Sequence, residues 1–195
     1  MDLISRLFAE LRGGDQRLAQ TAIAQIAALG EHVFPELNFM LSSSREDERW
    51  WAVRVLAEMD DLQAKETLLQ ALDDGAVSVR QCALLGLREQ PHPDAIQKLI
   101  LFLDDGDTLT RRLAGDALIA LGSRAVPDLV EIVGRGTSRA RVEAARALAR
   151  IADQRAIPAL YQLLDDESAL LSYWAEEGLE RMGAGMIFFS SGSEG

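Results

Sequence analysis

The fold is decided by the stretch Arg111-x-x-Ala114-x-x-Ala117-Leu118, which has copies along the whole chain. The full copies are Arg49-x-x-Ala52-x-x-Val55-Leu56, Arg80-x-x-Ala83-x-x-Gly86-Leu87 and Arg141-x-x-Ala144-x-x-Ala147-Leu148, and weaker copies are Ala19-x-x-Ala22 and Ser172-x-x-Ala175-x-x-Gly178-Leu179. Successive copies begin 30 or 31 residues apart. A constant period in this range predicts a stack of supersecondary units, none of which buries its apolar face alone.

Each repeat contains two stretches in which apolar residues recur at helical spacing. The first, helix A, carries the motif, and its small residues allow a neighbouring helix to approach closely. The second, helix B, follows a turn and has a proline near its start in three copies, at Pro35, Pro127 and Pro158. Proline suits the first helical turn, where no amide donor is needed. Residues 2–12 align with helix B, and residues 168–182 align with helix A.

This pattern predicts an all-α solenoid of about five A–B pairs with a half-repeat at each end, about twelve helices in all. Because the chain has no linker rich in Pro, Gly or Ser, residues 1–189 are expected to form a single solenoid. Residues 190–195 are expected to be a disordered tail. The apolar run before the tail is interpreted as a cap over the last helix or as a segment for self-association; it consists of Met186, Ile187, Phe188 and Phe189.

The composition disfavours several classes of function. The net charge of −11 argues against nucleic acid and anionic membranes as partners, because both need a basic face. Cys82 is the only cysteine, so neither an intrachain disulfide nor a cysteine metal site is expected. No stretch has the apolar length of a membrane span. The start, Met1 to Arg6, lacks the apolar run of a secretory signal, and a cytoplasmic protein is expected.

No group of residues suggests catalysis or metal binding, and we expect no enzyme activity and no cofactor. The acidic doublets such as Asp73-Asp74 and Asp104-Asp105 recur once per repeat, which spreads them along an edge instead of gathering them at one point. We interpret them as helix caps and as partners of the motif arginines. His32 and His92 lie two repeats apart, without ligand spacing. We expect Cys82 to be a buried, inert thiol.

The pattern V-R-x-x-A-x-x-A-L, a turn and A-[IV]-P-x-L-x-x-L-L-D-D resembles the short HEAT-like repeats found in phycobilin lyase subunits. Its best copies here are Arg80 to Leu103, Arg111 to Val133 and Arg141 to Asp166. The resemblance covers residues 2–182 and implies a right-handed solenoid in which B helices line the concave face and A helices the convex face. It also implies a ladder of loop Asp and motif Arg residues. On this chain the ladder would pair Asp47 with Arg49, Asp74 with Arg80 and Asp105 with Arg111, and would include Arg141.

Two sets of residues are candidates for binding a partner. The first is the outward-facing position of the B helices, a typical ligand surface of solenoids; it comprises Phe39, Gln70, Leu101, Glu131 and Gln162. The second is the residue that follows the motif anchor in two repeats, Trp50 and Tyr173. Helical geometry places this residue about opposite the core stripe, where an aromatic side chain often anchors a partner.

The leading interpretation is a non-catalytic scaffold or adaptor that binds a protein or peptide with basic and apolar residues. The alternative, implied by the resemblance, is an accessory subunit of a bilin lyase or a chromophore-handling factor, with a pocket near Tyr161, Tyr173 and Trp174. A nucleic-acid repair solenoid of the HEAT-like glycosylase type needs a basic inner channel. The acidic composition disfavours that third alternative.

Overall fold

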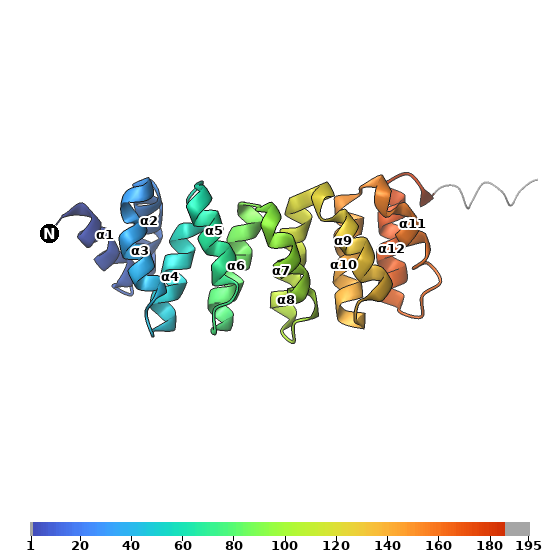
Figure 1. Cartoon of the computed structure of the whole chain (residues 1–195), viewed down its shortest axis with the longest axis horizontal. Coiled ribbons are helices and arrows are strands. Elements are labelled where there is room, and N and C mark those ends of the chain that lie inside the picture. Colours follow the sequence, from blue (N-terminus) through green and yellow to red (C-terminus); the bar gives the residue numbers. More distant parts are fainter. Residues whose placement is uncertain (1, 186–195) are drawn as a thin grey trace, which may run out of the picture. The chain divides into compact units, whose positions relative to one another are not determined.

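The structure is a computed structural model that describes residues 2–185, in which every regular element is helical (Figure 1). The all-α repeat fold is confirmed, because the described residues form twelve α-helices that alternate between the two predicted kinds. The B helices are α1 (Leu3–Arg12), α3 (Phe34–Leu41), α5 (Leu62–Ala71), α7 (Ile96–Leu101), α9 (Val126–Arg135) and α11 (Ile157–Tyr161). The A helices are α2 (Gln16–Ala27), α4 (Glu46–Leu56), α6 (Val77–Glu89), α8 (Thr108–Leu121), α10 (Ser138–Ile151) and α12 (Ala169–Arg181).

Side-chain caps and prolines fix where many of the helices begin. The carboxylates of Asp2, Asp15, Asp61 and Asp107 accept hydrogen bonds from backbone amides in the first turns of α1, α2, α5 and α8. Such bonds satisfy amide groups that have no partner inside the helix. Prolines stand in the first turn of α3, α9 and α11, as the sequence predicts.

Short 3-10 helices lie between the A and B helices of most repeats. They are η1 (Gly30–Val33), η2 (Pro93–Ala95), η4 (Gly122–Arg124) and η5 (Gln154–Ala156), and a further one, η3 (Phe102–Asp104), follows α7. Gly30 and Gly122 have φ values of 59° and 62°, which reverse the chain at low steric cost. Ala152 occupies the same left-handed region at φ 54°, directly after α10.

The chain divides into two compact units, Met1–His92 and Pro93–Gly195. In the first unit, α4 packs against α2 and α6, and each A helix packs against the B helix that precedes it. The core of this unit is formed by large apolar side chains that are almost fully buried, among them Phe8, Ile23, Met40, Leu56 and Leu84. The predicted amphipathic helices therefore bury their apolar faces against one another.

The second unit has the same internal order. Here α10 packs against α8, α9 and α12, while α7 packs on α8 and α11 on α12. Leu99, Leu118, Leu129, Leu148 and Leu160 have no exposed area. The single solenoid over residues 1–189 remains a prediction. The proposed cap, Met186 to Phe189, and the tail at 190–195 lie outside the described residues.

Candidate binding surfaces

Motif arginines connect successive repeats through their loops. Arg49 forms a bidentate pair with Asp74, with Nε 2.7 Å from Oδ2 and Nη2 2.9 Å from Oδ1. Arg141 pairs with the equivalent aspartate in the second unit through one bond, with Nη2 2.6 Å from Oδ2 of Asp166, while its Nε donates to the main-chain oxygen of Val133. In both pairs the aspartate stands 25 residues after the arginine and belongs to the next repeat. Bidentate, charge-assisted bonds of this kind fix geometry as well as adding stability.

The carboxylate of Asp74 has a different partner from the predicted one. Its Oδ1 accepts from the amide of Ala76 at 2.8 Å, and this turn directs the carboxylate toward Arg49 of the preceding repeat. Arg80, the predicted partner, donates instead to the main-chain oxygen of Asp74 at 2.8 Å. The hydrogen bond from Arg49 is the main cause that lowers the pKa of Asp74.

Two other predicted ladder pairs also differ in detail. Arg111 Nη1 lies 2.6 Å from the main-chain oxygen of Asp105, whose carboxylate accepts from the amide of Asp107 in the same loop. Asp47 pairs with Arg45, whose Nη2 lies 2.6 Å from Oδ2. The predicted residues therefore lie in the loop network, but Arg80 and Arg111 bind their own loops through main-chain oxygens and not through the predicted carboxylates.

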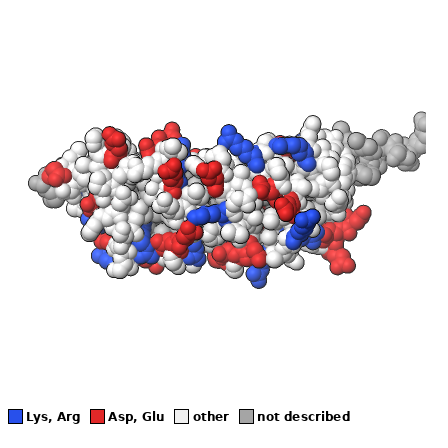
Figure 2. Space-filling model, viewed as in Figure 1, with Lys and Arg blue, Asp and Glu red and all other residues white. Residues whose placement is uncertain are grey.

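The predicted outward-facing position of the B helices is exposed in every copy; its residues are Phe39 and Gln70 in the first unit and Leu101, Glu131 and Gln162 in the second. Phe39 is 68% exposed and Leu101 75%, values unusual for large apolar side chains. Glu131 lies beside Arg135, with an Oε1–Nη1 distance of 3.8 Å. The visible face in Figure 2 carries acidic and basic side chains interspersed with neutral areas.

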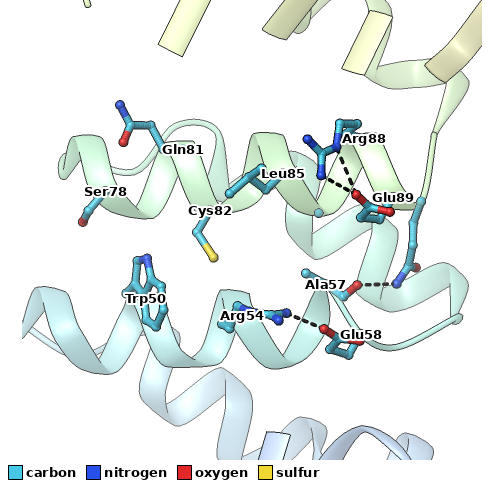
Figure 3. Close-up of a pocket in the computed structure, with 12 residues that line it drawn as sticks. Trp50, Arg54, Ala57, Glu58, Ser78, Gln81, Cys82, Leu85, Arg88 and Glu89 are labelled. Atoms are coloured by element: carbon cyan, nitrogen blue, oxygen red, sulfur yellow. Dashed lines mark hydrogen bonds and ion pairs between the residues drawn. The ribbon is translucent and has the colours of Figure 1, made fainter. Parts of the chain in front are cut away.

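A groove runs between the A helices α4 and α6 of the first unit (Figure 3). One hollow of about 670 Å³ is lined by Trp50, Arg54 and Glu58 from α4 and its end, and by Gln81, Cys82, Leu85 and Glu89 from α6, among others. A second hollow of about 570 Å³ shares Trp50 and Ser78 with the first and adds Arg45, Glu46, Asp47 and Trp51. We call the two hollows together the Trp50 groove.

Trp50 is therefore half-buried in the wall of this groove, whereas Tyr173 is 52% exposed. Each forms an edge-to-face pair with the next residue in its helix. The ring centroids are 4.8 Å apart for Trp50 and Trp51, and 4.9 Å apart for Tyr173 and Trp174. The repeat motif predicts the equivalent positions of these two pairs. It does not predict the hollow beside Trp50, which depends on the side chains of two helices about thirty residues apart.

Cys82 is 3% exposed at the floor of the groove. Burial raises the pKa of its thiol to about 11. The thiol is therefore protonated at neutral pH, as expected for an inert structural cysteine. Across residues 2–185 there is no cluster of three or more His, Cys, Asp or Glu side chains arranged for a metal ion.

Arg146 is a buried polar residue that the sequence analysis did not identify. It is 2% exposed, and its Nη1 lies 2.7 Å from Asp116 Oδ1 on α8. Its Nε donates to Glu143 at 2.7 Å, and its Nη2 donates to the main-chain oxygen of Arg112 at 3.1 Å. One available signal was that Asp116 and Arg146 stand at the same position in adjacent repeats, five residues after their anchors.

Tyr161 is half-buried and donates its hydroxyl hydrogen bond to the main-chain oxygen of Ala184 at 2.8 Å. This bond holds the segment after α12 against the end of α11. None of the described helices has both the length and the apolar character needed to cross a membrane.

Comparison with known families gives one match. The family model described as HEAT repeats matches residues 35–119 and 96–180, which together are more than half of the chain. No curated protein matches the chain significantly in sequence.

Several solved structures resemble the chain in fold. The crystal structure of one engineered protein has a TM-score of 0.54 and 24% identity, covering 95% of this chain and 100% of the other. A second engineered protein has a TM-score of 0.53 and 21% identity, with 95% and 98% covered. Human deoxyhypusine hydroxylase in complex with glycerol has a TM-score of 0.52 and 22% identity, with 92% and 73% covered. At these identities the likeness concerns the fold alone.

Proposed function

Because the chain belongs to the HEAT repeat family, we propose that it is a non-catalytic scaffold or adaptor that binds a protein or peptide through its B helices. A repeat fold does not by itself specify function, and the proposal depends on the surface. The observation that carries it is the exposure of Phe39 and Leu101 at one position of the repeat. Large apolar side chains held on rigid helices can act as binding anchors.

The charge of the chain supports a basic partner. With a net charge of −11, the protein attracts cationic chains and accelerates their encounter. In the second unit, α9 packs against α7, which carries Leu101, and α9 presents Asp128 and Glu131. A segment that combines basic and apolar residues would satisfy both the carboxylates and the anchors.

Selection from a displayed peptide library tests this function. We expect the full chain to enrich peptides with basic and apolar residues, and the variants Phe39→Ala and Leu101→Ala to weaken their binding by about tenfold or more. Matched controls are Leu18→Ala and Leu109→Ala, since these leucines are 50% and 54% exposed but lie on the A helices α2 and α8. The proposal fails if no peptide is enriched, or if the A-helix variants weaken binding as much as the B-helix variants.

A chromophore-handling role is the alternative, suggested by the resemblance to repeats of phycobilin lyase subunits. The candidate residues for this role are Tyr161, Tyr173 and Trp174. Absorbance of the purified protein mixed with a bilin separates the two functions, because a chromophore-binding protein would shift the spectrum of the bilin and a peptide scaffold would not. Two further proposals are that the chain self-associates through Met186 to Phe189 and that it is located in the cytoplasm.

A further inference from the structure

The Trp50 groove is formed by A helices, and its function does not depend on the proposed role of the B helices. Both of its hollows are within the size range of small-ligand sites, and both are partly walled by the Trp50 indole. In Figure 3 the Trp50 side chain extends from α4 toward α6, with Arg54 further along the same helix and Cys82 and Leu85 opposite. The groove therefore presents a half-buried aromatic surface on a rigid support.

The aromatic groups in the groove favour a cation. Trp50 and Trp51 pack edge to face, with an interplanar angle of 79°, so that the two ring planes form a corner beside the second hollow. An indole face attracts a positive group through the negative charge of its π surface, and tryptophan is the strongest aromatic group in this respect.

The ionic groups in the walls leave negative charge beside the tryptophans. Each arginine of the groove is already paired with a carboxylate: Arg45 with Asp47, Arg54 with Glu58 and Arg88 with Glu89. Glu46 accepts a hydrogen bond from the neutral hydroxyl of Ser78, across the groove on α6. This contact does not neutralise the charge of Glu46. Glu46 also attracts Arg49 of the same helix, but Arg49 is paired with Asp74. Glu46 lines the same hollow as the two indoles.

One buried acceptor lies at the other end of the groove, away from Glu46. Gln90 donates from Nε2 to the main-chain oxygen of Ala57 at 2.7 Å, while its buried Oε1 has no hydrogen-bond partner. This oxygen has almost no accessible area, so it is part of the packing between α4 and α6 and not of the ligand surface. The groups available to a ligand are therefore those of the second hollow, where an aromatic surface and an acidic group lie together.

We propose that the Trp50 groove binds an arginine side chain of a partner polypeptide, with the guanidinium stacked on the Trp50 indole and paired with Glu46. Arginine fits better than lysine because its guanidinium is planar, weakly hydrated and able to stack while donating several hydrogen bonds. Its aliphatic stem can lie along the Trp50 indole, which walls both hollows. The surface would thus recognise a basic segment on the A-helix side of the first unit.

The test uses the full chain and two small probes of nearly equal shape, N-acetyl-arginine amide and N-acetyl-citrulline amide. The indole N–H signals of the three tryptophans are followed by NMR during each titration. We expect the arginine probe to shift the Trp50 signal in a saturable manner, with a Kd in the millimolar range. The neutral citrulline probe should bind about tenfold more weakly. Equal binding of both probes, or no saturable shift, would overturn the proposal.

Variants locate the site. Trp50→Ala and Glu46→Gln should each weaken binding of the arginine probe by about fivefold or more. Because Trp50→Ala lacks the indole signal, binding to both variants is measured from the NMR shifts of backbone amides in α6. Tyr173→Ala is the matched control, since Tyr173 has the same repeat position and an edge-to-face neighbour, but Ala169 and Leu170 replace Glu46 and Asp47. Unchanged binding by Glu46→Gln, which preserves the size of the side chain, or equal loss in Tyr173→Ala, would contradict the assignment.

Discussion

Arg146 is the largest fully buried side chain among the described residues, and three oxygen-bearing groups surround its guanidinium. A buried charge is costly unless hydrogen bonds and opposite charges compensate for its lost hydration. Asp116 comes from α8, while Glu143 comes from the same helix as Arg146. The guanidinium therefore joins two A helices by ionic contacts.

Arg146→Ala should destabilise the protein by about 3 kcal/mol, because it leaves two partly buried carboxylates without their cation and creates a cavity. Arg146→Met should destabilise the protein less than Arg146→Ala, since methionine retains most of the volume of the arginine side chain. Urea unfolding followed by circular dichroism measures both variants. Arg150→Ala is the control, because Arg150 is an exposed residue of the same helix. Equal effects of Arg146→Ala and Arg150→Ala would show that the network is not stabilising.

Asp74→Asn should destabilise the first unit by about 2 kcal/mol at pH 7, because it removes a bidentate bond to Arg49. The effect should depend on pH. Since the folded state lowers the pKa of Asp74, its contribution is full above the unfolded pKa of about 3.9. That contribution is lost as the pH falls through the lower folded pKa. Urea unfolding at pH 7 and at about pH 2.5 should therefore show a smaller difference between the two proteins at the acid value.

Residue types could be predicted more accurately than their partners. The repeat indicated that Arg49 and Asp74 belong to a loop network, but the pairing of these two residues depends on how far successive repeats are offset. Likewise, Asp116 and Arg146 were visible in the sequence as opposite charges at one repeat position. Whether they approach each other depends on Gly115, at which an added Cβ would lie 2.5 Å from Arg146 Nη2.

At the scale of helices, the distance between neighbours is set by small residues. At Gly178 of α12 the neighbour is another helix backbone: an added Cβ would lie 2.7 Å from Leu160 Cδ1 and 3.0 Å from the backbone Cα of Ala149. Backbone atoms of a packed helix cannot move aside without shifting the whole element. The glycine therefore permits α12 to contact both α10 and α11.

Gly178→Ala should therefore destabilise the protein by about 2 kcal/mol, despite the higher helix propensity of alanine. Gly134→Ala provides the opposite case, because Gly134 lies within α9 with no heavy atom within 4 Å of an added Cβ. This second substitution should stabilise the protein by up to about 1 kcal/mol. Thermal unfolding compares the Tm of each variant with that of the unchanged chain. A higher Tm for Gly178→Ala would show that α12 packs less closely than its contacts indicate.

Helix order was the most predictable feature, and helix length was less so. The period of the motif placed all twelve α-helices, because each apolar stripe has to be buried against a neighbour. However, α7 ends at Leu101 and continues as the 3-10 helix η3, and α11 comprises only five residues. Local tightening of the last turn depends on packing and is not encoded in the apolar pattern.

For the whole molecule, the composition makes a prediction about the kind of partner but none about where it binds. The net charge and the exposed B-helix position follow directly from the sequence. The Trp50 groove could not be predicted in the same way, because a hollow arises from the volumes of side chains on α4 and α6 together. The sequence showed only that Trp50 points away from the core stripe, and its half-buried environment required the packed structure.

The net charge of −11 also makes a prediction about stability. Like charges repel across the folded chain at low ionic strength, where the Debye length is about 30 Å at 0.01 M, and salt screens this repulsion. Screening also weakens attractive pairs, but exposed ion pairs contribute only about 0–1 kcal/mol each. The half-buried pairs Arg49–Asp74 and Arg141–Asp166 are shielded from solvent, so salt should weaken their attraction less than that of exposed pairs.

Raising NaCl from about 10 mM to about 500 mM should therefore increase the Tm by about 2–4 °C, equivalent to about 1 kcal/mol for a chain of this size. Differential scanning calorimetry in NaCl is the appropriate measurement, because sulfate would stabilise the protein through exclusion from its surface. A fall in Tm with NaCl would mean that ion pairs outweigh the repulsion. In that case Asp74→Asn and Arg146→Met should reduce the dependence on salt, which identifies the pairs responsible.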